Sequence, residues 1–295
     1  MREIIQLQAD GTFAVDNDVM RFRTGDFSQL ERRFGPRRPG PVDRYEEASI
    51  AAALQVVTEE AVIHLARTLH GMANTASRER GGPPIDGLCL AGGVALNCVA
   101  NDKLLRETHF NKLWVQPAAN DAGTALGAAA LLHTLLSQPG RPRMDHAYLG
   151  PDYDGDAMDA ALGAAGLSHV IVEDPAVEAA RRLERGEIIA WFQGRLEFGP
   201  RALGHRSILA DPTRFDTRQR INNRVKMRES FRPFAPSVLD STVERFFDVH
   251  PGTLCADYML TASPMKDNRM SQVIPAVVQE NGSTHLATSR LHRVS

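Results

Sequence analysis

The chain of 295 residues carries 34 lysines and arginines against 36 aspartates and glutamates, a net charge of −2 that gives no general support for nucleic acid or an anionic membrane as ligand. Hydrophobic residues make up 43% of the chain and aromatic residues 6%, and this composition with the chain length predicts a globular protein of about two domains. No run of uncharged apolar residues approaches the ~18 residues of a membrane span, and the first residues, MREIIQLQAD, contain no secretory signal. We therefore expect a cytoplasmic protein. Three cysteines (Cys89, Cys98 and Cys255) without a CxxC pair argue against a disulfide framework and a zinc ribbon, and we expect them in or near the core.

The first part of the chain alternates strand and helix patterns. Asp10-Gly11 is a hairpin turn signal. Residues 20–43 are rich in Arg, Gly and Pro and show no clear period, and residues 37–41 within them predict an exposed loop. His64 and His70 are six residues apart and fall on different helix faces, which predicts structural histidines rather than a metal pair. The predicted elements are strands at 3–7 and 12–15, a helix from near Tyr45 to Met72 that ends before Asn74, a strand at 88–90, a helix at 94–105, a strand at 112–116 and a helix at 124–135.

Two successive strand-glycine-helix units stand out in this part. Gly92 and Gly93 follow the strand at 88–90, and Asp121-Ala122-Gly123 opens the helix after the next strand. Such glycines let backbone N–H groups approach a phosphate or a nucleoside, although a tight turn without ligand explains the first pair equally well and Asp121 can be only a helix N-cap. Both turns are expected at the same edge of a sheet, where ligands bind in α/β folds.

Residues 136–156 are rich in Pro, Gly and Asp and predict an interdomain linker. A second set of elements follows it, and its buried strand at 188–192 leads the chain into an arginine-rich stretch. The predicted elements are helices at 158–167, 176–185 and 243–247, and strands at 170–172, 188–192, 256–261 and 272–278, with a last strand in HLATSRLHRVS.

The arginine-rich stretch runs from Gly194 to Leu239 and contains ten basic and four acidic residues, a local net charge of +6. Glycines and prolines predict loops, and apolar residues such as Leu203 and Phe234 between the charges predict that these loops rest on a core. Basic loops held against a core are typical of an anion-binding cleft, whereas a charge run alone usually marks a solvated face. Nucleic acid is disfavoured, because the phenylalanines lie between prolines as core anchors instead of forming a stacking platform.

Several segments in order, LCLAGGVALNCVAN, WVQPAANDAGTALGAA, GRLEFGPRALGHRSILADP, NRVKMRESFRPFAPSV, ADYMLTASP and IPAVV, resemble the O-carbamoyltransferases of the NodU/CmcH type over nearly the whole chain. The resemblance implies an α/β protein, with a partial actin/sugar-kinase/Hsp70-like (Kae1-like) lobe at 1–138, a linker at 139–155 and an α+β YrdC-like domain at 156–295. It also implies that carbamoyl phosphate and ATP, with Mg²⁺, form carbamoyl adenylate, and that the carbamoyl group then passes to a hydroxyl-bearing acceptor.

Site residues follow from the matching motifs. The resemblance implies that Gly92, Gly93, Asn97 and Gly123 bind the nucleotide and that Asp121 stands at the iron position of the family. Charge and motif together assign Arg201, Lys226 and Arg228 to catalysis, and Arg206, Ser207, Arg232 and Ser237 to binding of carbamoyl phosphate and ATP. Two or three of these basic side chains are expected to pair instead with Glu197, Asp211 or Glu229.

The chain also departs from the family pattern. Relatives begin with an HDSAAAL-like motif followed by histidine metal ligands, and they continue into an LNTSFN-like segment, neither of which is in this chain. Because Asp121 alone cannot hold a transition metal, we expect no bound Fe²⁺ and weak or no transfer to an acceptor by this chain alone. Apolar surface left on an incomplete lobe would favour a homo-oligomer or a partner chain that supplies the missing part.

Two alternatives remain open. The GGVA turn also fits a sugar-kinase-like or threonylcarbamoyladenosine-type ATPase, which would not share the GPRALG stretch. A non-catalytic nucleotide-binding remnant would keep both glycine turns without turnover. The acceptor itself is not indicated by any motif in the chain.

Overall fold

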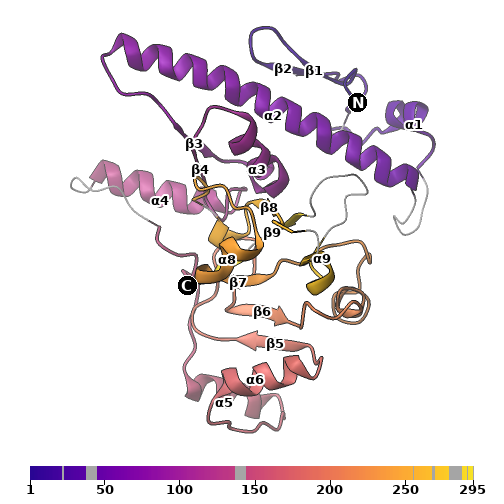
Figure 1. Cartoon of the computed structure of the whole chain (residues 1–295), viewed down its shortest axis with the longest axis vertical. Coiled ribbons are helices and arrows are strands. Elements are labelled where there is room, and N and C mark those ends of the chain that lie inside the picture. Colours follow the sequence, from indigo (N-terminus) through magenta and orange to yellow (C-terminus); the bar gives the residue numbers. More distant parts are fainter. Residues whose placement is uncertain are drawn as a thin grey trace.

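A computed structural model of the chain describes residues 1–21, 23–37, 45–136, 144–254, 256–267, 270–278, 288–290 and 292–294. Helices and small two-stranded sheets form a mixed α/β arrangement, with the long helix α2 along one side and α5 and α6 at the opposite end (Figure 1). The elements of the first part are β1 (Ile5–Leu7), β2 (Phe13–Val15), α1 (Ser28–Phe34), α2 (Tyr45–Glu79), β3 (Gly87–Leu90), the 3-10 helix η1 (Gly93–Leu96), α3 (Cys98–Glu107), β4 (Lys112–Val115) and α4 (Gly123–Leu136).

The elements of the second part are α5 (Gly155–Ala164), α6 (Pro175–Glu184), β5 (Ile189–Phe192), β6 (Arg206–Leu209), α7 (Thr217–Arg220), the π-helical η2 (Ile221–Lys226), β7 (Ser237–Leu239), α8 (Asp240–Phe246), the 3-10 helix η3 (Ala256–Tyr258), β8 (Ala262–Pro264), α9 (Met270–Val273), β9 (Thr288–Arg290) and β10 (His292–Val294). The mixture of helices and strands confirms the α/β class expected from the sequence. Its more specific assignment to a Kae1-like lobe and a YrdC-like domain stays a prediction.

The N-terminal hairpin and α2 form one layer. β1 and β2 pair antiparallel around the predicted turn at Asp10 and Gly11, which confirms the hairpin. α2 begins at Tyr45 as predicted but passes Asn74 and ends at Glu79, because the Asn74 amide bonds the chain that returns beside the helix. Asn74 Oδ1 accepts from the backbone N–H of Ile85 at 2.9 Å, and Asn74 Nδ2 donates to the Ile85 carbonyl at 3.0 Å. The Asn74 side chain therefore links α2 to the returning segment and does not end the helix.

Over 47–79, α2 is long and apolar enough to cross a membrane by length and composition alone, a test that core helices of globular proteins also pass. The segment at 20–43, in which the sequence shows no clear period, contains the short helix α1. The predicted loop at 37–41 lies outside the described residues from 38 onward.

The main core lies where α2 and α3 cover the parallel pair β3 and β4. Leu104 of α3 and Leu113 and Val115 of β4 are at most 1% exposed, and Leu260 from the second part closes the same cluster. The predicted continuous helix at 94–105 is interrupted, because Asn97 leaves the helical conformation and its side chain accepts from Ala100 N at 3.2 Å. Cys98 is buried in this region, whereas Cys89 is exposed against expectation.

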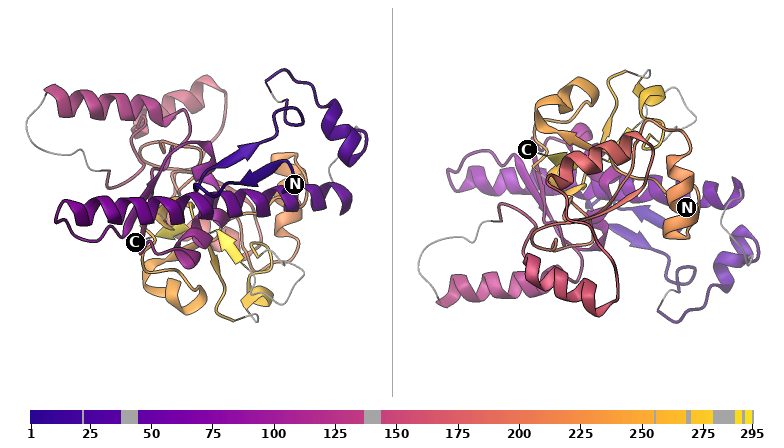
Figure 2. Two further views of the ribbon diagram at one scale, coloured as in Figure 1. Left: turned by 90° about the horizontal axis from the view of Figure 1, so that it is seen from above. Right: turned by 90° about the horizontal axis from the view of Figure 1, so that it is seen from below.

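The predicted linker packs onto this core over part of its length. Ala147 is 1% exposed, and backbone hydrogen bonds join 147–151 to 196–198. Phe198 N donates to Ala147 O at 2.6 Å, and Gly150 N donates to Leu196 O at 2.9 Å. Residues 139–143 lie outside the described residues. The 144–150 segment thus holds the start of the arginine-rich stretch beside the first part of the chain. Seen from above, the N-terminal hairpin lies alongside α2 (Figure 2).

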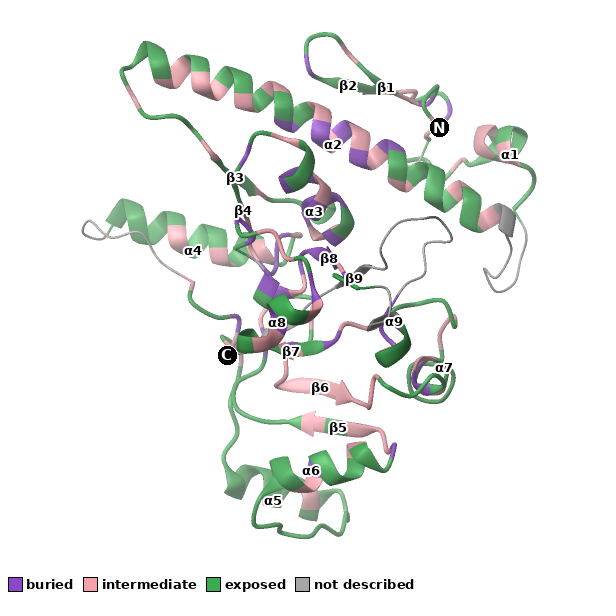
Figure 3. Cartoon of the chain, viewed as in Figure 1, coloured by how far each residue is buried: buried purple, intermediate pink, exposed green. Residues whose placement is uncertain are grey.

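The second part confirms the helices and corrects several strands. α5, α6 and α8 lie within a few residues of their predicted ranges. The strand expected at 170–172 is absent, since Val170 and Ile171 are 85% and 87% exposed and the segment has no strand assignment. The strands expected at 256–261 and 272–278 are replaced by η3 and α9, because short apolar runs do not distinguish strand from helix. β5 forms as predicted but is half-exposed instead of buried, as Figure 3 shows.

Candidate functional site

The two glycine turns meet at one edge of the β3–β4 sheet, as the sequence predicts. β3 and β4 run parallel, with Leu90 opposite Val115, so both chains leave the sheet at the same edge. The backbone N–H of Gly92 in the first turn donates to the carbonyl of Ala119 in the second at 2.8 Å. This direct hydrogen bond fixes the two turns relative to each other.

A cavity of about 1220 Å³ opens at these turns, and we call it the edge cavity. Its charged side chains include the carboxylates of Asp121 and Asp145, and no lysine or arginine is among the described residues that line it. Gln116 Oε1 and Asn120 Oδ1 are buried without a hydrogen-bond partner in the described part of the chain. The lining residues include Ala91, Gly92, Trp114, Gln116, Asn120, Asp121, Gly123, Thr124, Met144, Asp145 and His146. Unsatisfied buried amide groups are costly, so the cavity is suited to a ligand that supplies hydrogen bonds.

The predicted nucleotide residues divide into two groups. Gly92, with φ +96°, and Gly123 line the edge cavity. A Cβ at Gly123 would overlap the Ala118 carbonyl oxygen, so this glycine is needed for the turn itself. Gly93 and Asn97 do not line the cavity, and the Asn97 amide caps α3 and exchanges hydrogen bonds with Gln55 of α2 at 2.9 and 3.1 Å. Asn97 thus has a structural role that its motif position did not reveal.

Asp121 lies at the rim of the edge cavity, at the start of α4. Among the described residues there is no group of three or more His, Cys, Asp or Glu side chains that could hold a metal ion. The residues around Asp121 therefore do not fit an iron site, and no step of the chemistry below depends on one. The structural interpretation of the α2 histidines agrees with their contacts, since His64 Nε2 lies 2.9 Å from Gln8 O and His70 packs edge-on against Phe110.

The start of the arginine-rich stretch, residues 197–207, folds around a buried carboxylate, and we call it the Glu197 loop. Glu197 Oε1 accepts from the backbone N–H groups of Leu203, His205 and Arg206 at 2.7, 2.9 and 3.2 Å. Burial opposes the charge of Glu197, but these backbone donors outweigh it and lower the pKa of the carboxyl below its usual value. The carboxylate therefore stabilises the loop that carries it, and among the described residues Glu197, one of the three acids considered as arginine partners, forms no ion pair.

The Glu197 loop lies directly against the second glycine turn. A Cβ on Gly199 would come within 3.0 Å of the Pro117 carbonyl oxygen, so the backbones are in contact there. Tyr148 stacks on His205 with ring centroids 3.7 Å apart and donates from its hydroxyl to Leu203 O at 2.8 Å. Burial, followed by the charges of Glu197 and Asp257, raises the pKa of Tyr148 and keeps this hydroxyl protonated.

His146 continues this ring stack toward the edge cavity, which it lines, with its ring 5.8 Å from that of Tyr148. Sequence reasoning placed His146 and Tyr148 in a linker and missed both. The sequence signal that could have indicated their packing is the occurrence of a histidine and a tyrosine close together in MDHAYLG, which is unusual for a linker.

Three predicted residues, Arg201, Arg206 and Ser207, belong to the Glu197 loop. Arg206 Nη1 donates to Gln193 O at 2.7 Å, and the guanidinium lies over the Phe192 ring at 3.4 Å from its centroid. Arg206 Nη2 is buried and has no hydrogen-bond partner within the described ranges. Ser207 Oγ accepts from Gly204 N at 2.9 Å and so helps to shape the loop.

The other predicted basic residues follow α7, which lies past the end of β6 that is opposite Arg206 (Figure 3). Arg228 Nε donates to Asn222 Oδ1 at 2.7 Å, and its guanidinium lies over Phe234. Burial, and then the charge of Arg232, lower the pKa of Arg228. Arg232 pairs with Glu229 at 2.7 Å, as the sequence predicted for some of these arginines. Lys226 ends η2 and Ser237 begins β7.

Two protein-family models match the chain. A model described as the carbamoyltransferase N-terminus matches residues 1–130, and one described as the carbamoyltransferase C-terminus matches residues 180–293. The matches flank the predicted linker and together include both groups of predicted site residues.

Similar curated proteins agree with these matches. The chain is 38% identical to an uncharacterized protein of Synechocystis over 97% of this chain and 47% of that protein. It is 39% identical to the nodulation protein NolO of Bradyrhizobium diazoefficiens, over 88% of this chain and 46% of NolO. It is 38% identical to a 3'-hydroxymethylcephem-O-carbamoyltransferase of Streptomyces clavuligerus, over 65% of this chain and 33% of that enzyme. The chain spans about half the length, or less, of these relatives.

Proposed function

Because the chain belongs to the NodU/CmcH family of carbamoyltransferases, we propose that it takes part in ATP-dependent O-carbamoyl transfer from carbamoyl phosphate to a hydroxyl group. The name of the Streptomyces relative, which specifies O-carbamoylation of a hydroxymethylcephem, supports a hydroxyl as acceptor. The proposal covers the formation of carbamoyl adenylate from carbamoyl phosphate and ATP, with release of phosphate and pyrophosphate, and the later transfer of the carbamoyl group to the hydroxyl, with release of AMP. Its cellular location would be the cytoplasm, where ATP is available.

The observation that carries the proposal is the contact between the Glu197 loop and the edge cavity. An arginine-bearing loop reaches the Pro117 carbonyl through Gly199, while the cavity itself has no cationic side chain among its described lining residues. A nucleoside polyphosphate fits this arrangement, in which a cavity whose described lining has no cationic side chain lies beside a basic loop. The nucleoside would use the amide groups of Gln116 and Asn120, and the phosphates would extend toward the basic loop.

Charge arrangement suggests roles for the arginines. Arg201 and Arg206 belong to a loop whose shape is fixed by Glu197, so their guanidinium groups would be preorganised for phosphate oxygens. Such donors act on charge that develops on the transferring groups and need little reorganisation during the reaction. Lys226, Arg228 and Arg232 would bind a second anionic group, and burial followed by the nearby charge of Arg232 lowers the pKa of Arg228.

Carbamoyl phosphate-dependent exchange of labelled pyrophosphate into ATP tests the proposal. We expect exchange by the wild-type chain that requires carbamoyl phosphate and falls at least tenfold in Arg201→Ala. Arg182→Ala is the matched control, because Arg182 is an exposed arginine of α6 that pairs with Glu178. Exchange without carbamoyl phosphate, or an equal loss in both variants, would contradict the assignment. Nucleotide binding without any exchange would favour the remnant interpretation.

A further inference from the structure

A buried asparagine lies among the basic residues that follow α7. Asn222 belongs to η2 and is 0% exposed, and Lys226, Arg228 and Arg232 come after it in the chain. Its amide makes three hydrogen bonds within the described ranges, one as acceptor and two as donor. Buried polar groups are normally paired, and here each pair is with the segment that carries the basic residues.

The partners of Asn222 leave one orientation for its amide. Oδ1 accepts from Arg228 Nε at 2.7 Å, and Nδ2 donates to the carbonyl oxygens of Ser230 and Arg232 at 3.2 and 2.9 Å. A guanidinium can only donate and a carbonyl oxygen can only accept, so the reversed amide would satisfy none of these contacts. An aspartate would face two carbonyl oxygens with an acceptor, and an aliphatic side chain would leave all three groups unpaired. Both halves of the amide are therefore needed.

The backbone of Asn222 holds the same segment. The N–H groups of Met227 and Arg228 both donate to the Asn222 carbonyl oxygen, the second at 3.0 Å. Met227 has φ +46° and ψ +52°, a left-handed conformation that is unfavourable for a residue with a Cβ. Its side chain is 84% exposed, so packing of the side chain does not explain this conformation. Strained backbone persists where surrounding contacts fix it, and the contacts here are with Asn222.

The Arg228 guanidinium is held from three directions. Its Nε donates to Asn222 Oδ1, its Nη2 lies 3.5 Å from Pro233 O, and its central carbon lies 4.9 Å from the centroid of the Phe234 ring. Nε and Nη2 share one edge of the guanidinium, so that edge faces the protein. Nη1 donates to no atom in the described part of the chain. The edge formed by Nη1 and Nη2 can therefore give two parallel hydrogen bonds to the oxygens of one phosphoryl group.

Asn222 also holds two positive charges near each other. It bonds Arg228 through Nε and Arg232 through its backbone carbonyl, and the charge of Arg232 acts on Arg228. Within the described ranges, Glu229 is the single acid that forms an ion pair with either arginine. Two guanidinium groups against one carboxylate leave a net positive charge, which a bound anion would balance.

We propose that Asn222 is a positioning residue, which acts through Arg228 by holding the Nη1–Nη2 edge of its guanidinium in place for a phosphoryl group. This role rests on the proposed function, in which the basic residues after α7 bind an anionic group. It adds a requirement that charge alone does not impose. Without the Asn222 amide, Arg228 would keep its charge and lose the fixed direction of its donors.

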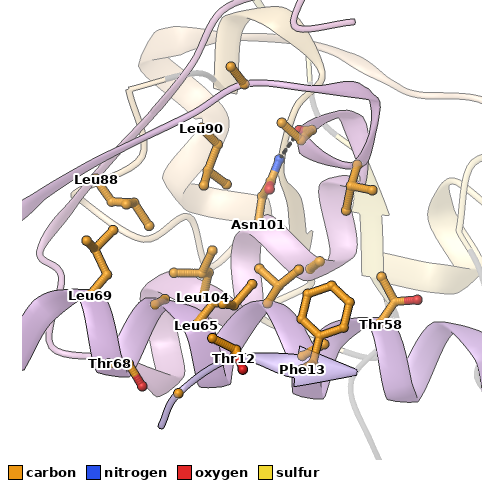
Figure 4. A pocket seen from close by; sticks show the side chains of 18 of the residues that line it. Thr12, Phe13, Thr58, Leu65, Thr68, Leu69, Leu88, Leu90, Asn101 and Leu104 are labelled. Carbon is orange, nitrogen blue, oxygen red and sulfur yellow. Dashed lines mark hydrogen bonds between the residues drawn. The ribbon is translucent and has the colours of Figure 1, made fainter. Parts of the chain in front are cut away.

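Asn101 of α3 supplies a matched control. It is 1% exposed, and its Nδ2 donates to the carbonyl oxygens of Ala95 and Leu260, both at 2.8 Å. Figure 4 shows the Asn101 amide in the lining of an apolar pocket, whose described residues include no arginine. Asn222→Ser and Asn101→Ser thus each remove a buried amide with two carbonyl partners, and the first also removes the acceptor for an arginine.

Binding of pyrophosphate, measured by isothermal titration calorimetry, tests the proposal. Asn222→Ser should weaken binding by about tenfold or more, whereas Asn101→Ser should change it by less than about twofold. Arg228→Lys keeps the charge but has no fork of donors, so it should weaken binding by a similar factor of about ten. Because Asn222 acts through the arginine, adding Asn222→Ser to Arg228→Lys should weaken binding by no more than about another twofold.

NMR of the Arg228 Nε–H group gives a reading that does not depend on the reaction. This proton should exchange with water about tenfold faster or more in Asn222→Ser, and at the wild-type rate in Asn101→Ser. In the wild type it should exchange about tenfold more slowly than the Nε–H of the exposed Arg224, a comparison that holds even where Asn222→Ser does not fold.

Four results would overturn the role of Asn222. They are no binding of pyrophosphate by the wild type, equal weakening in the two asparagine variants, additive losses in the double variant, and an Arg228 Nε–H that exchanges as fast as that of Arg224. A different result would count against the proposed reaction alone. It is pyrophosphate binding and Nε–H exchange as expected, without carbamoyl phosphate-dependent incorporation of pyrophosphate into ATP.

Discussion

Glu197→Ala is expected to destabilise the chain by about 3–5 kcal/mol. Its Oε1 accepts three backbone N–H groups, of which the one on Leu203 belongs to a residue that is 3% exposed. Leaving a buried donor unsatisfied costs about 1–3 kcal/mol. The Leu203 donor is placed near the upper end of that range, while those of His205 and Arg206 are half-buried and can recover some hydration.

Urea unfolding followed by circular dichroism measures this change, and Glu229→Ala is its control. Glu229 has one arginine partner, Arg232, in a pair that is largely exposed, so its removal should cost about 0–1 kcal/mol. Amide hydrogen exchange measures the local effect. The backbone N–H of Leu203 should exchange about tenfold faster in Glu197→Ala for every 1.4 kcal/mol by which the free energy of local opening falls. A Glu197→Ala variant within about 0.5 kcal/mol of wild type, with unchanged exchange at Leu203, would refute the role of the carboxylate.

The same carboxylate predicts a pH dependence. The pKa of Glu197 is lowered on folding, so its stabilising contribution is complete above the ordinary value of 4.5 and is lost as the pH falls through the lower folded-state pKa. Glu197→Gln removes the charge and with it this titration. The stability difference between wild type and Glu197→Gln should therefore shrink on acidification below 4.5, and a difference that stays constant there would contradict the sign of the shift.

Two further changes test other parts of the framework. Gly123→Ala should destabilise the chain by about 1–3 kcal/mol in thermal unfolding, because its Cβ would overlap the Ala118 carbonyl oxygen. Gly127→Ala in the same helix is the control, because a Cβ there meets open space, and it should stabilise the chain by about 0.5–1 kcal/mol. Changes of the same sign in both variants would refute the close contact at Gly123. Asn74→Ala should cost about 1–3 kcal/mol in urea unfolding by removing both hydrogen bonds to Ile85, and a neutral effect would show that the end of α2 does not need this tie.

Local patterns in the sequence were sufficient for elements that form from neighbouring residues. The hairpin at Asp10 and Gly11 and the two glycine turns at 91–93 and 121–123 were predicted, because turn residues and short-range periodicity set them. The meeting of both turns at one sheet edge also followed, since parallel strands end on the same side. The motifs around Gly199 and Arg228 were specific enough to indicate the carbamoyltransferase family, as the family models show.

Tertiary contacts decided what the local pattern left open. Asn97 stands in a glycine-turn motif, but its amide bonds Gln55, a residue 42 positions earlier, and so serves the packing of α3 on α2. The segment around Tyr148 has the composition of a linker, yet Ala147 is buried in the core and Tyr148 packs against the core and donates to Leu203 O of the Glu197 loop. Composition and spacing record preferences of adjacent residues, whereas the roles of Asn97 and Tyr148 depend on partners that only folding brings within hydrogen-bond distance.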